Sequence, residues 1–500
     1  MWLKRSAKLS WNSDERSPAT RTRRVLVGLS KRLLSLCPAR PKQWVLCKAA
    51  AAGRVRAVRW LHEIGANLRA YDDAPLRLAA ANGRLEVLRY LHQNGVDVPQ
   101  IAAGAEALRL AAAGGHREAV KYLHENGVVT SDLSHEGCSC LKAMTAELAM
   151  APEIYHPSAF WKEVGAGHTL LLSWTGEANF KRTINQNYFD FIPAGSDAAR
   201  IAPLMRLPPQ EEGGAGPGYR LESPDCDPNL WTSWLPSYQI FKGDRRLQEE
   251  LYTRLVRTLY EFVLTHDHEG ILQRLEEPLL GNPIRLWRGP KLISQDLANS
   301  VWERSVILGG LRHRDSARPL VIAELGAGYG RLGHVLLAST DCRYMVFDIP
   351  PALYLAQWYL SSLFPERRIF RFRPFDSFSG VEAELREADI AFFTPNQLER
   401  FPAAYFDAFI NISSLHEMRR EQIELFLAQM ARTTRRLIYL KEYERYRNPY
   451  DDITIERSDY VWPGGWEVSL ERPDILNPDF FELLARPSAE PLPSSGKGRG

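Results

Sequence analysis

The sequence lacks long apolar runs and contains few cysteines. In its 500 residues no stretch approaches the roughly 20 apolar residues that a membrane-spanning helix needs, so we expect no membrane span. Six cysteines occur without an even spacing of pairs, which excludes a disulfide scaffold and indicates a reducing compartment. The apolar core of a secretory signal is also missing. These absences predict a cytoplasmic protein.

Positive charge is concentrated near the N-terminus. The formal charge of the chain is +3, yet residues 1–40 hold ten Lys/Arg and two acidic residues, which makes +8 there and −5 elsewhere. We therefore expect no nucleic-acid binding by the main body. Residues 1–42 predict a basic, disordered arm; an organelle-targeting segment and a patch for nucleic acid or acidic lipid are the alternatives. Residues 487–500 predict a disordered tail.

Residues 43–130 contain an internal repeat. One pattern occurs three times, at intervals of 30 and 32 residues: small residues, a glycine turn, an aromatic-Leu-His triplet and a closing glycine. Each unit predicts two closely packed helices with a left-handed end. The triplets end at His62, His92 and His124, for which we predict packing and hydrogen bonding rather than metal binding. The pattern resembles a short ankyrin repeat array, and this resemblance implies a concave face that binds a protein partner.

Between the repeats and the last domain the signals are weaker. Residues 131–156 predict a connector, and residues 157–318 predict a helical region that covers a sheet and contacts the substrate. Leucines four residues apart predict a helix within 244–275. The stretches 179–189 and 293–300 are rich in amides, which suit a hydroxyl-rich ligand because an unmatched buried donor costs about 1–3 kcal/mol. Helix capping is the alternative. The predicted substrate-binding residues are Asn185, Asn187, Gln295, Asp296 and Asn299.

Residues 319–486 have the order of a nucleotide-binding domain. A buried strand ends at Glu324 and runs into the glycine loop 325–330, after which a helix and a second strand follow; that second strand ends at Asp348. This order is half of a doubly wound sheet that binds a nucleoside. Further strands are predicted over 389–394, 406–411 and 437–441, with 370–375 and Asp376 as an alternative third strand and its acid.

Glu324 distinguishes between two cofactors. The glycines over 328–333 also fit a nicotinamide site, but a carboxylate beside the crevice repels a pyrophosphate and attracts the ammonium group of S-adenosylmethionine. The E-x-G-x-G-x-G form is typical of class I methyltransferases. We therefore predict a doubly wound, Rossmann-like α/β methyltransferase domain with helical cover, preceded by the all-α repeats. The predicted cofactor-binding residues are Glu324, Gly326, Gly328, Gly330, Asp348, Asn396, Gln397 and Asn411.

Residues 157–485 resemble the bacterial-type sugar O-methyltransferase family. The motifs that carry this resemblance are 157–161, 179–189, 276–278, 281–283, 293–300, 324–330 and 411–418. The resemblance implies an enzyme that uses S-adenosylmethionine to methylate a hydroxyl of a sugar or glycan. Two alternatives stay open. One is an interaction protein with a silent methyltransferase domain, and the other is a protein methyltransferase recruited by the repeats.

O-methylation requires the acceptor hydroxyl to lose a proton, and a base of near-neutral pKa accelerates that step by about 10² to 10⁴. His416 follows the fourth strand, where plant-type O-methyltransferases place a histidine, and Glu417 can orient it. We predict His416 and Glu417 as catalytic residues. No compact carboxylate cluster predicts a metal site, although Asp451 and Asp452 stay an alternative.

Overall fold

The computed structural model describes residues 39–96, 102–113, 116–126, 135–184, 218–222, 245–311, 318–448, 450–477 and 479–488. These residues form two compact units. We call them the repeat unit, up to Val129 without Ala112–Gly115, and the α/β unit, which follows. Most of the predicted arm and tail lies outside the described residues, and both stay predictions. The first described helix begins at Ala39, inside the segment assigned to the arm.

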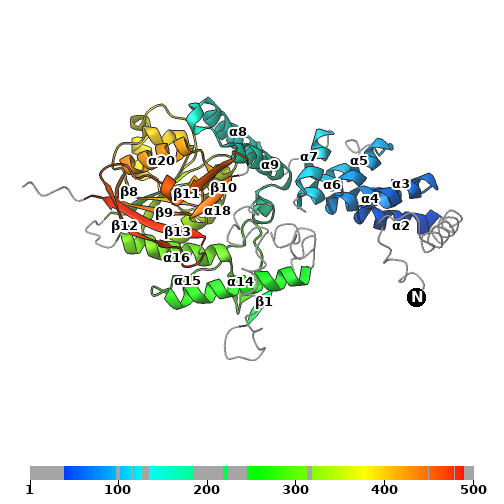
Figure 1. Cartoon of the computed structure of the whole chain (residues 1–500), viewed down its shortest axis with the longest axis horizontal. Coiled ribbons are helices and arrows are strands. Elements are labelled where there is room, and N and C mark those ends of the chain that lie inside the picture. The colour runs from blue at the N-terminus through cyan, green and yellow to red at the C-terminus, as the bar shows by residue number, and fades with distance from the viewer. Residues whose placement is uncertain are drawn as a thin grey trace, which may run out of the picture. The chain divides into compact units, whose positions relative to one another are not determined.

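The described part of the repeat unit consists of helices joined in pairs (Figure 1). Ala50, Ala80 and Ala111 are completely buried, so the helix backbones approach closely. Gly83 has a φ of 61°, and a Cβ there would lie 2.6 Å from Nδ1 of His116 in the next repeat. The pairs are α2 (Ala39–Ala51) with α3 (Val55–Glu63), α4 (Ala70–Ala81) with α5 (Leu85–Gln93), and α6 (Ala102–Ala113) with α7 (Arg117–Glu125).

Two of the repeated histidines bind the following repeat. Nδ1 of His62 lies 2.9 Å from the hydroxyl of Tyr90, and Nδ1 of His92 lies 3.0 Å from the hydroxyl of Tyr122. In both pairs the rings also meet edge to face. Packing and hydrogen bonding are therefore confirmed for these two histidines. The side chain of His124 lies outside the described residues.

The α/β unit is built on an open sheet that has eight strands in the described part of the chain. β4 (Leu320–Leu325) lies in its interior, with β5 (Cys342–Phe347) and β8 (Phe406–Ile412) as parallel neighbours on its two sides. Beyond β5, the sheet continues in parallel with β7 (Ile390–Phe393) and β6 (Ile369–Phe370). The predicted strand 389–394 is therefore present, whereas the alternative over 370–375 contributes only the short edge strand β6.

The other half of the sheet begins at β9 (Thr434–Tyr443), which is parallel to β8. The antiparallel strand β13 (Phe480–Pro487) follows it, and β12 (Trp466–Pro473) forms the edge. From β4 the chain passes to β5, β6 and β7 and then returns to β8 on the other side of β4. Ligands of doubly wound sheets bind at the carboxyl edge where the order reverses in this way. The architecture is the Rossmann-like fold that we expected after the helical repeats.

Helices cover both faces of the sheet. Figure 1 shows α16 (Gln295–Gly310) and α20 (Arg420–Thr433) on opposite faces. On the α20 face the core is strongly aromatic, with Phe347, Phe393 and Phe409 completely buried. α17 (Arg331–Ser339) packs against α16, and α18 (Ala352–Leu363) packs against α17 and β5.

The helix predicted within 244–275 is confirmed as α14 (Arg245–His266), which packs against α16. Its most deeply buried residues are Tyr252, Val256, Tyr260 and Val263, and the first three each follow one of the leucines of the pattern by one position. Gly270 ends this segment with a left-handed conformation and precedes the short helix α15 (Ile271–Arg274).

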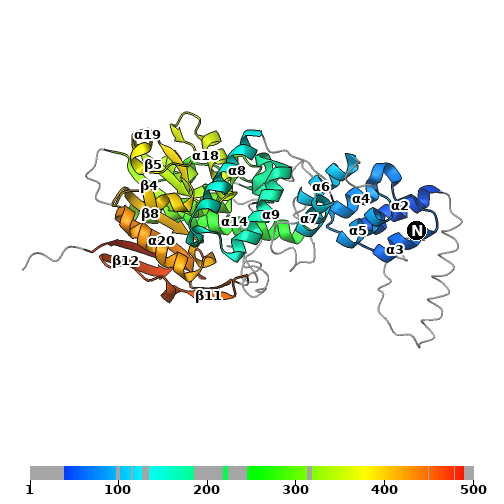
Figure 2. The ribbon, with the colours of Figure 1, turned by 90° about the horizontal axis from the view of Figure 1, so that it is seen from above.

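The segment that we assigned to a connector contains the helix α8 (His135–Met150), which lies beside α18 (Figure 2). Leu141, Met144 and Leu148 are buried at helical spacing, a period that the sequence analysis did not use. Glu147 accepts hydrogen bonds from Asn396 and Arg400 at 3.0 and 3.1 Å. This helix therefore belongs to the cover of the sheet. It leads through a 3₁₀ turn into α9 (Ala159–Thr175).

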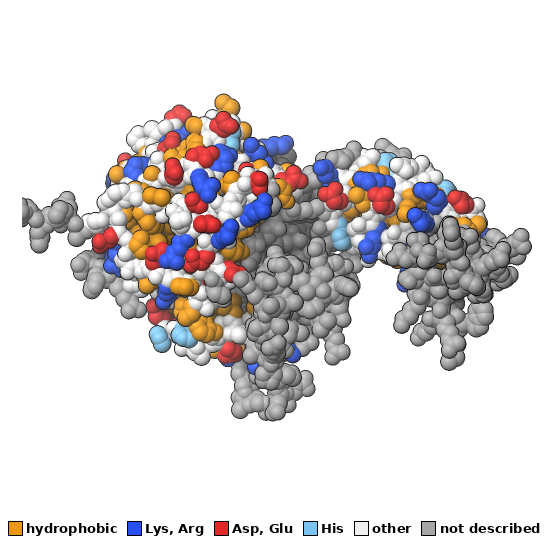
Figure 3. All heavy atoms as spheres, in the orientation of Figure 1, with side chains coloured by type: hydrophobic (Ala, Val, Ile, Leu, Met, Phe, Trp, Pro, Cys, Tyr) orange, Lys and Arg blue, Asp and Glu red, His pale blue; other side chains and the backbone are white. Residues whose placement is uncertain are grey.

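Small elements complete the α/β unit. The described strands outside the main sheet are β1 (Tyr219–Leu221), β2 (Leu286–Arg288), β3 (Lys291–Ile293), β10 (Arg445–Asn448) and β11 (Ile453–Glu456). The remaining short helices are η3 (Glu153–Tyr155), η4 (Glu177–Asn179), α10 (Phe180–Thr183), η6 (Phe378–Gly380), α19 (Glu382–Glu387), η7 (Pro395–Arg400), η8 (Leu415–Glu417) and η9 (Arg457–Asp459). Figure 3 shows acidic and basic side chains intermingled on the visible face of this unit. None of the described helices is long and apolar enough to span a bilayer.

Candidate functional site

A cavity opens at the carboxyl edge of the sheet, where β4, β5, β7 and β8 end. Its sheet side is lined by the loop 324–329, by Asp348 and Ile349, by Pro395 and by 412–414. The rest of its lining includes Pro157, Ser158, Phe160, Trp161, Glu417 and Met418. The cavity measures about 1150 Å³ including the space at its mouth. It therefore lies where a doubly wound sheet binds its ligand.

The glycine loop after β4 presents bare backbone to this cavity. Gly326 has a φ of 73°, which favours glycine, and a Cβ there would lie 2.3 Å from Oγ of Ser414. The backbone N–H of Gly328 donates to Oδ2 of Asp348 at 2.8 Å. Of the predicted glycines, Gly326 and Gly328 line the cavity, whereas Gly330 precedes α17 and does not.

Two buried acids stand at the ends of neighbouring strands. Burial raises the pKa of Glu324 to about 8, and the carboxylates of Glu303 and Asp348 add to this rise while Arg331 opposes it. Tyr344 donates its hydroxyl to Oε2 of Glu324. Burial also raises the pKa of Asp348 to about 7, against backbone N–H donors that include Ile349 at 2.7 Å. Both acids line the cavity, as predicted, and both need a partner to remain ionised.

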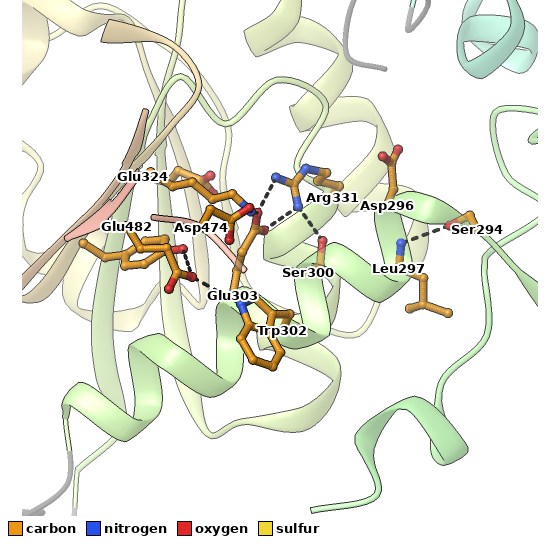
Figure 4. A network of polar contacts seen from close by, with 12 residues as sticks. Ser294, Asp296, Leu297, Ser300, Trp302, Glu303, Glu324, Arg331, Asp474 and Glu482 are labelled. Carbon is orange, nitrogen blue, oxygen red and sulfur yellow. Dashed lines mark hydrogen bonds and ion pairs between the residues drawn. The ribbon is translucent and has the colours of Figure 1, made fainter. Parts of the chain in front are cut away.

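A buried ionic network holds Arg331 at the side of this cavity (Figure 4). Its guanidinium bonds both oxygens of Glu303, at 2.6 and 3.1 Å, and Oγ of Ser300 at 2.9 Å. Nζ of Lys441 lies 3.3 Å from Glu303 and 3.1 Å from Asp474. Burial alone would raise the pKa of Glu303, but Arg331 and Lys441 outweigh it and the pKa falls below its usual value. The two buried cations are thus already paired with acids.

The ring of His416 is not part of the cavity wall. Its Nδ1 lies 2.5 Å from Oε2 of Glu442, and the ring packs against Tyr443 and Tyr446 at 4.8 and 4.4 Å. The same carboxylate accepts the backbone N–H groups of Ser414 and Leu415 at 3.0 and 2.9 Å. The structure therefore places His416 behind the cavity wall, where it supports η8, and its role as the base stays a prediction.

Glu417, the other predicted catalytic residue, does line the cavity. Its Oε2 accepts a hydrogen bond from Nε1 of Trp161 at 2.8 Å. Nε2 of His416 lies 3.9 Å from Oε1 of Glu417, so the two side chains are neighbours. Of the two, Glu417 is the one that lines the cavity.

Trp161 is held in place from the β10–β11 hairpin. Oδ1 and Oδ2 of Asp451 accept the backbone N–H groups of Ala159 and Phe160, at 2.9 and 3.2 Å, at the start of α9. Nδ2 of Asn448 donates to the same carboxylate at 2.9 Å. Asp451 is therefore engaged as a helix cap. Within the described ranges no group of three or more His, Cys, Asp or Glu side chains is arranged to hold a metal ion.

Three predicted cofactor residues are used within the protein and do not line the cavity. Nδ2 of Asn396 donates to Glu147 of α8. Gln397 accepts from the Thr394 backbone at 3.0 Å and donates to the Arg373 carbonyl at 3.0 Å. Asn411 donates to the Leu325 carbonyl at 2.9 Å and so ties β8 to the glycine loop. The sequence placed these residues at the correct strand ends but did not specify the direction of their side chains.

The predicted substrate residues of α16 are buried beside the glycine loop and do not line the cavity. Oδ2 of Asp296 accepts a hydrogen bond from the Tyr329 hydroxyl at 2.6 Å. Gln295 and Asn299 lie on the same helix, each 1% exposed. Asn185 and Asn187 lie outside the described residues.

Sequence reasoning missed several residues of the site. Tyr329 belongs to the glycine loop and Arg331 is the first residue of α17. A tyrosine and an arginine beside a glycine motif could have identified both as candidate site residues. Ser413 lines the cavity with a φ of 54°, a left-handed conformation that a serine in the sequence does not predict. Trp161 belonged to a motif that we used only for the resemblance. Glu442 lies within a buried strand, where an isolated acid is itself a signal.

Comparison with known proteins gives one family match and several distant structural neighbours. The family model described as ankyrin repeats in many copies matches residues 46–92 and 76–124. No curated protein matches the chain. Magnesium protoporphyrin IX methyltransferase from Synechocystis PCC 6803 with bound SAM is 14% identical and covers 39% of this chain and 83% of its own, with a TM-score of 0.26.

Two further structures are similarly distant. The 1,6-didemethyltoxoflavin-N1-methyltransferase of Burkholderia thailandensis, with its substrate and S-adenosylhomocysteine bound, is 14% identical over 39% of this chain and 79% of its own, with a TM-score of 0.25. The pyocyanin biosynthetic protein PhzM is 13% identical over 47% and 72%, with a TM-score of 0.27. These scores are below 0.5, and the Rossmann-like fold follows from the strand order of the sheet. The chain thus combines an ankyrin repeat region with a Rossmann-like α/β unit.

Proposed function

We propose that the α/β unit is an S-adenosylmethionine-dependent O-methyltransferase whose acceptor is a hydroxyl of a sugar or glycan. One observation carries this proposal: buried Glu324 and Asp348 end neighbouring strands on either side of a bare glycine loop, at the switch point of the sheet. A buried carboxyl of raised pKa suits a cationic partner, because the partner's charge repays the cost of ionisation.

The residues present fit the cofactor. Glu324 accepts hydrogen bonds from an ammonium group, and Asp348 accepts them from ribose hydroxyls through lone pairs that the Gly328 and Ile349 N–H groups leave available. Gly326 and Gly328 allow the ligand to approach the backbone. The apolar Ile349 and Pro395 supply a surface for a base. When bound, S-adenosylmethionine supplies a methyl group on a positively charged sulfur.

Glu417, which lines the same cavity, accepts the proton of the acceptor hydroxyl as the oxygen is methylated. The hydrogen bond from Trp161 restricts the orientation of the carboxylate, so less ordering is needed during the reaction. The rings of Phe160 and Trp161 pack against the C–H face of a sugar and exclude water. The resemblance of residues 157–485 to sugar O-methyltransferases supports this acceptor class.

The ankyrin repeats serve as a surface for a protein partner, in line with the usual role of such arrays. Glu324, Gly326, Gly328 and Asp348 all line one cavity, which favours an active donor site over a silent domain. Protein methylation with recruitment by the repeats is the alternative that acceptor screening distinguishes.

Calorimetry with S-adenosylmethionine and S-adenosylhomocysteine tests the donor site. We expect micromolar binding that is lost in the folded double variant Glu324→Ala/Asp348→Ala. Transfer of a labelled methyl group to a panel of saccharides, phenols and peptides then tests the acceptor. Absence of binding by folded wild-type protein contradicts the methyltransferase proposal, and transfer only to phenols or peptides contradicts the sugar assignment.

A further inference from the structure

One face of α16 is polar and buried against the glycine loop. Asp296, Asn299, Ser300 and Glu303 are at most 6% exposed, and their spacing places them on the same side of the helix. The hydroxyl of Tyr329 bonds Asp296, and the guanidinium of Arg331 bonds Ser300 and Glu303. Because Tyr329 and Arg331 line the cavity, this helix face stands directly behind the donor half of the site.

Asn299 lies between these satisfied neighbours without partners of its own. Neither its Oδ1 nor its Nδ2 has a hydrogen-bond partner in the part of the chain that the structure describes. Oε1 of Gln295, one helical turn earlier, also has none there. Each atom is fully buried, and an unmatched buried polar group is costly and calls for an explanation. These three atoms lie within one turn of α16, so this helix face can form hydrogen bonds with a polar ligand.

The charges around this face narrow the chemistry of that ligand. Glu324 is an acceptor for a cation, but the buried cations Arg331 and Lys441 are already paired with acids. A ligand with both a positive and a negative group therefore needs a further donor for its carboxylate. Among the described residues, Nδ2 of Asn299 is an unpaired donor on this helix face. Burial raises the pKa of Asp296, while Arg331 and the hydrogen bond from Tyr329 oppose that rise.

We propose that Asn299 and Gln295 bind the amino-acid end of S-adenosylmethionine, with Nδ2 of Asn299 donating to the carboxylate and Oε1 of Gln295 accepting from the ammonium group. This inference rests on the proposed function and deepens its donor site. It replaces the acceptor-binding role that the sequence predicted for these residues. The amides then hold one end of the donor while Asp348 holds its ribose.

A comparison of two nucleosides isolates this contact. S-adenosylhomocysteine carries the amino-acid end, whereas 5′-methylthioadenosine lacks it and retains the adenosine. We expect Asn299→Ala to weaken the affinity for S-adenosylhomocysteine by about ten- to a hundred-fold, the effect of losing a hydrogen bond to a charged group, and to leave 5′-methylthioadenosine within two-fold. Gln295→Ala should show the same selectivity. Ser305→Ala, on the exposed side of the same helix, is the matched control.

The free protein gives a second measurement. Because the side chain of Asn299 makes no hydrogen bond in the described structure, Asn299→Ala should not lower the melting temperature of the ligand-free protein. An equal loss of affinity for both nucleosides, or unchanged affinity for S-adenosylhomocysteine, overturns this inference while the donor site stands. If folded wild-type protein binds neither nucleoside, the proposed function and this inference fail together.

Discussion

Nε1 of Trp161 donates a hydrogen bond to Oε2 of Glu417 at 2.8 Å, which joins residues 256 positions apart in the chain. One comes from the helical segment before the sheet, and the other from the turn after β8. Both residues line the cavity. The proposed acceptor part of the site therefore depends on where α9 packs within the α/β unit.

Glu417 is expected to limit the chemical step. Glu417→Gln keeps the shape of the side chain but removes the base, so kcat should fall by about 10² to 10⁴. The affinity for S-adenosylhomocysteine should remain unchanged, because Glu417 is not among the residues proposed to hold the donor. Trp161→Phe should lower kcat less, by roughly ten-fold. Steady-state kinetics with Glu421→Gln, an exposed acid on α20, as the control would test this; full activity of Glu417→Gln would contradict the assignment.

Donor binding is expected to depend on pH through Glu324. Its carboxyl, with a pKa of about 8, is mainly protonated in the free protein at pH 7 and must ionise to hold an ammonium group. Affinity should therefore tighten as pH rises from 6 to 8, and binding at pH 7 should release up to one proton from this carboxyl. Asp348, with a pKa of about 7, acts in the same direction.

Calorimetry in buffers of different ionisation enthalpy measures this proton release directly. Glu324→Gln should bind weakly and release fewer protons than the wild type. Constant affinity between pH 6 and 8, together with no proton release in the wild type, would show that Glu324 is already ionised in the free protein.

Asp451 is expected to act as a positioning residue for the acceptor wall. Asp451→Ala leaves the N-cap Ser158 in place but removes the hydrogen bonds from the Ala159 and Phe160 N–H groups, each worth about 1 kcal/mol, so the start of α9 with Phe160 and Trp161 should lose its fixed position. The KM for the acceptor should rise several-fold while donor affinity stays unchanged. Asp452→Ala is the matched control, because its side chain is 82% exposed and pairs only with exposed Arg447. Loss of activity on adding a chelator would instead support the alternative that Asp451 and Asp452 bind a metal ion.

The histidines that bond the following repeat, His62 and His92, are expected to stabilise the repeats without affecting methylation. His92→Ala removes the hydrogen bond to Tyr122 and should lower the free energy of unfolding of the repeat unit by about 1 kcal/mol. Gln93→Ala, an exposed neighbour on α5, should have little effect. Hydrogen exchange measured separately for the two units would give the stability of the repeat unit, and a methyl-transfer assay would give the activity. A parallel loss of activity would show that the repeats support the donor site.

The donor half of the site was predictable because it follows from local order. Glu324, Gly326, Gly328 and Asp348 are positioned by a strand, a turn and the next strand, and parallel pairing brings such strand ends to one edge. Asn411 was placed at the correct strand end, yet its amide bonds Leu325 rather than facing the cavity. Strand ends are local, whereas the direction of a side chain depends on what packs around it.

By itself, the sequence determined the repeat array, the doubly wound sheet and the acid–glycine–acid arrangement of the donor loop, because periodicity and backbone pairing act over short distances. Only the tertiary structure decided that His416 turns inward to Glu442, 26 positions later, while Glu417 faces the cavity beside Trp161. It also decided that α8 covers the sheet and that the amides of α16 stand behind the glycine loop. Those placements depend on hydrogen bonds and packing between segments far apart in the chain, and no local pattern of the sequence records them.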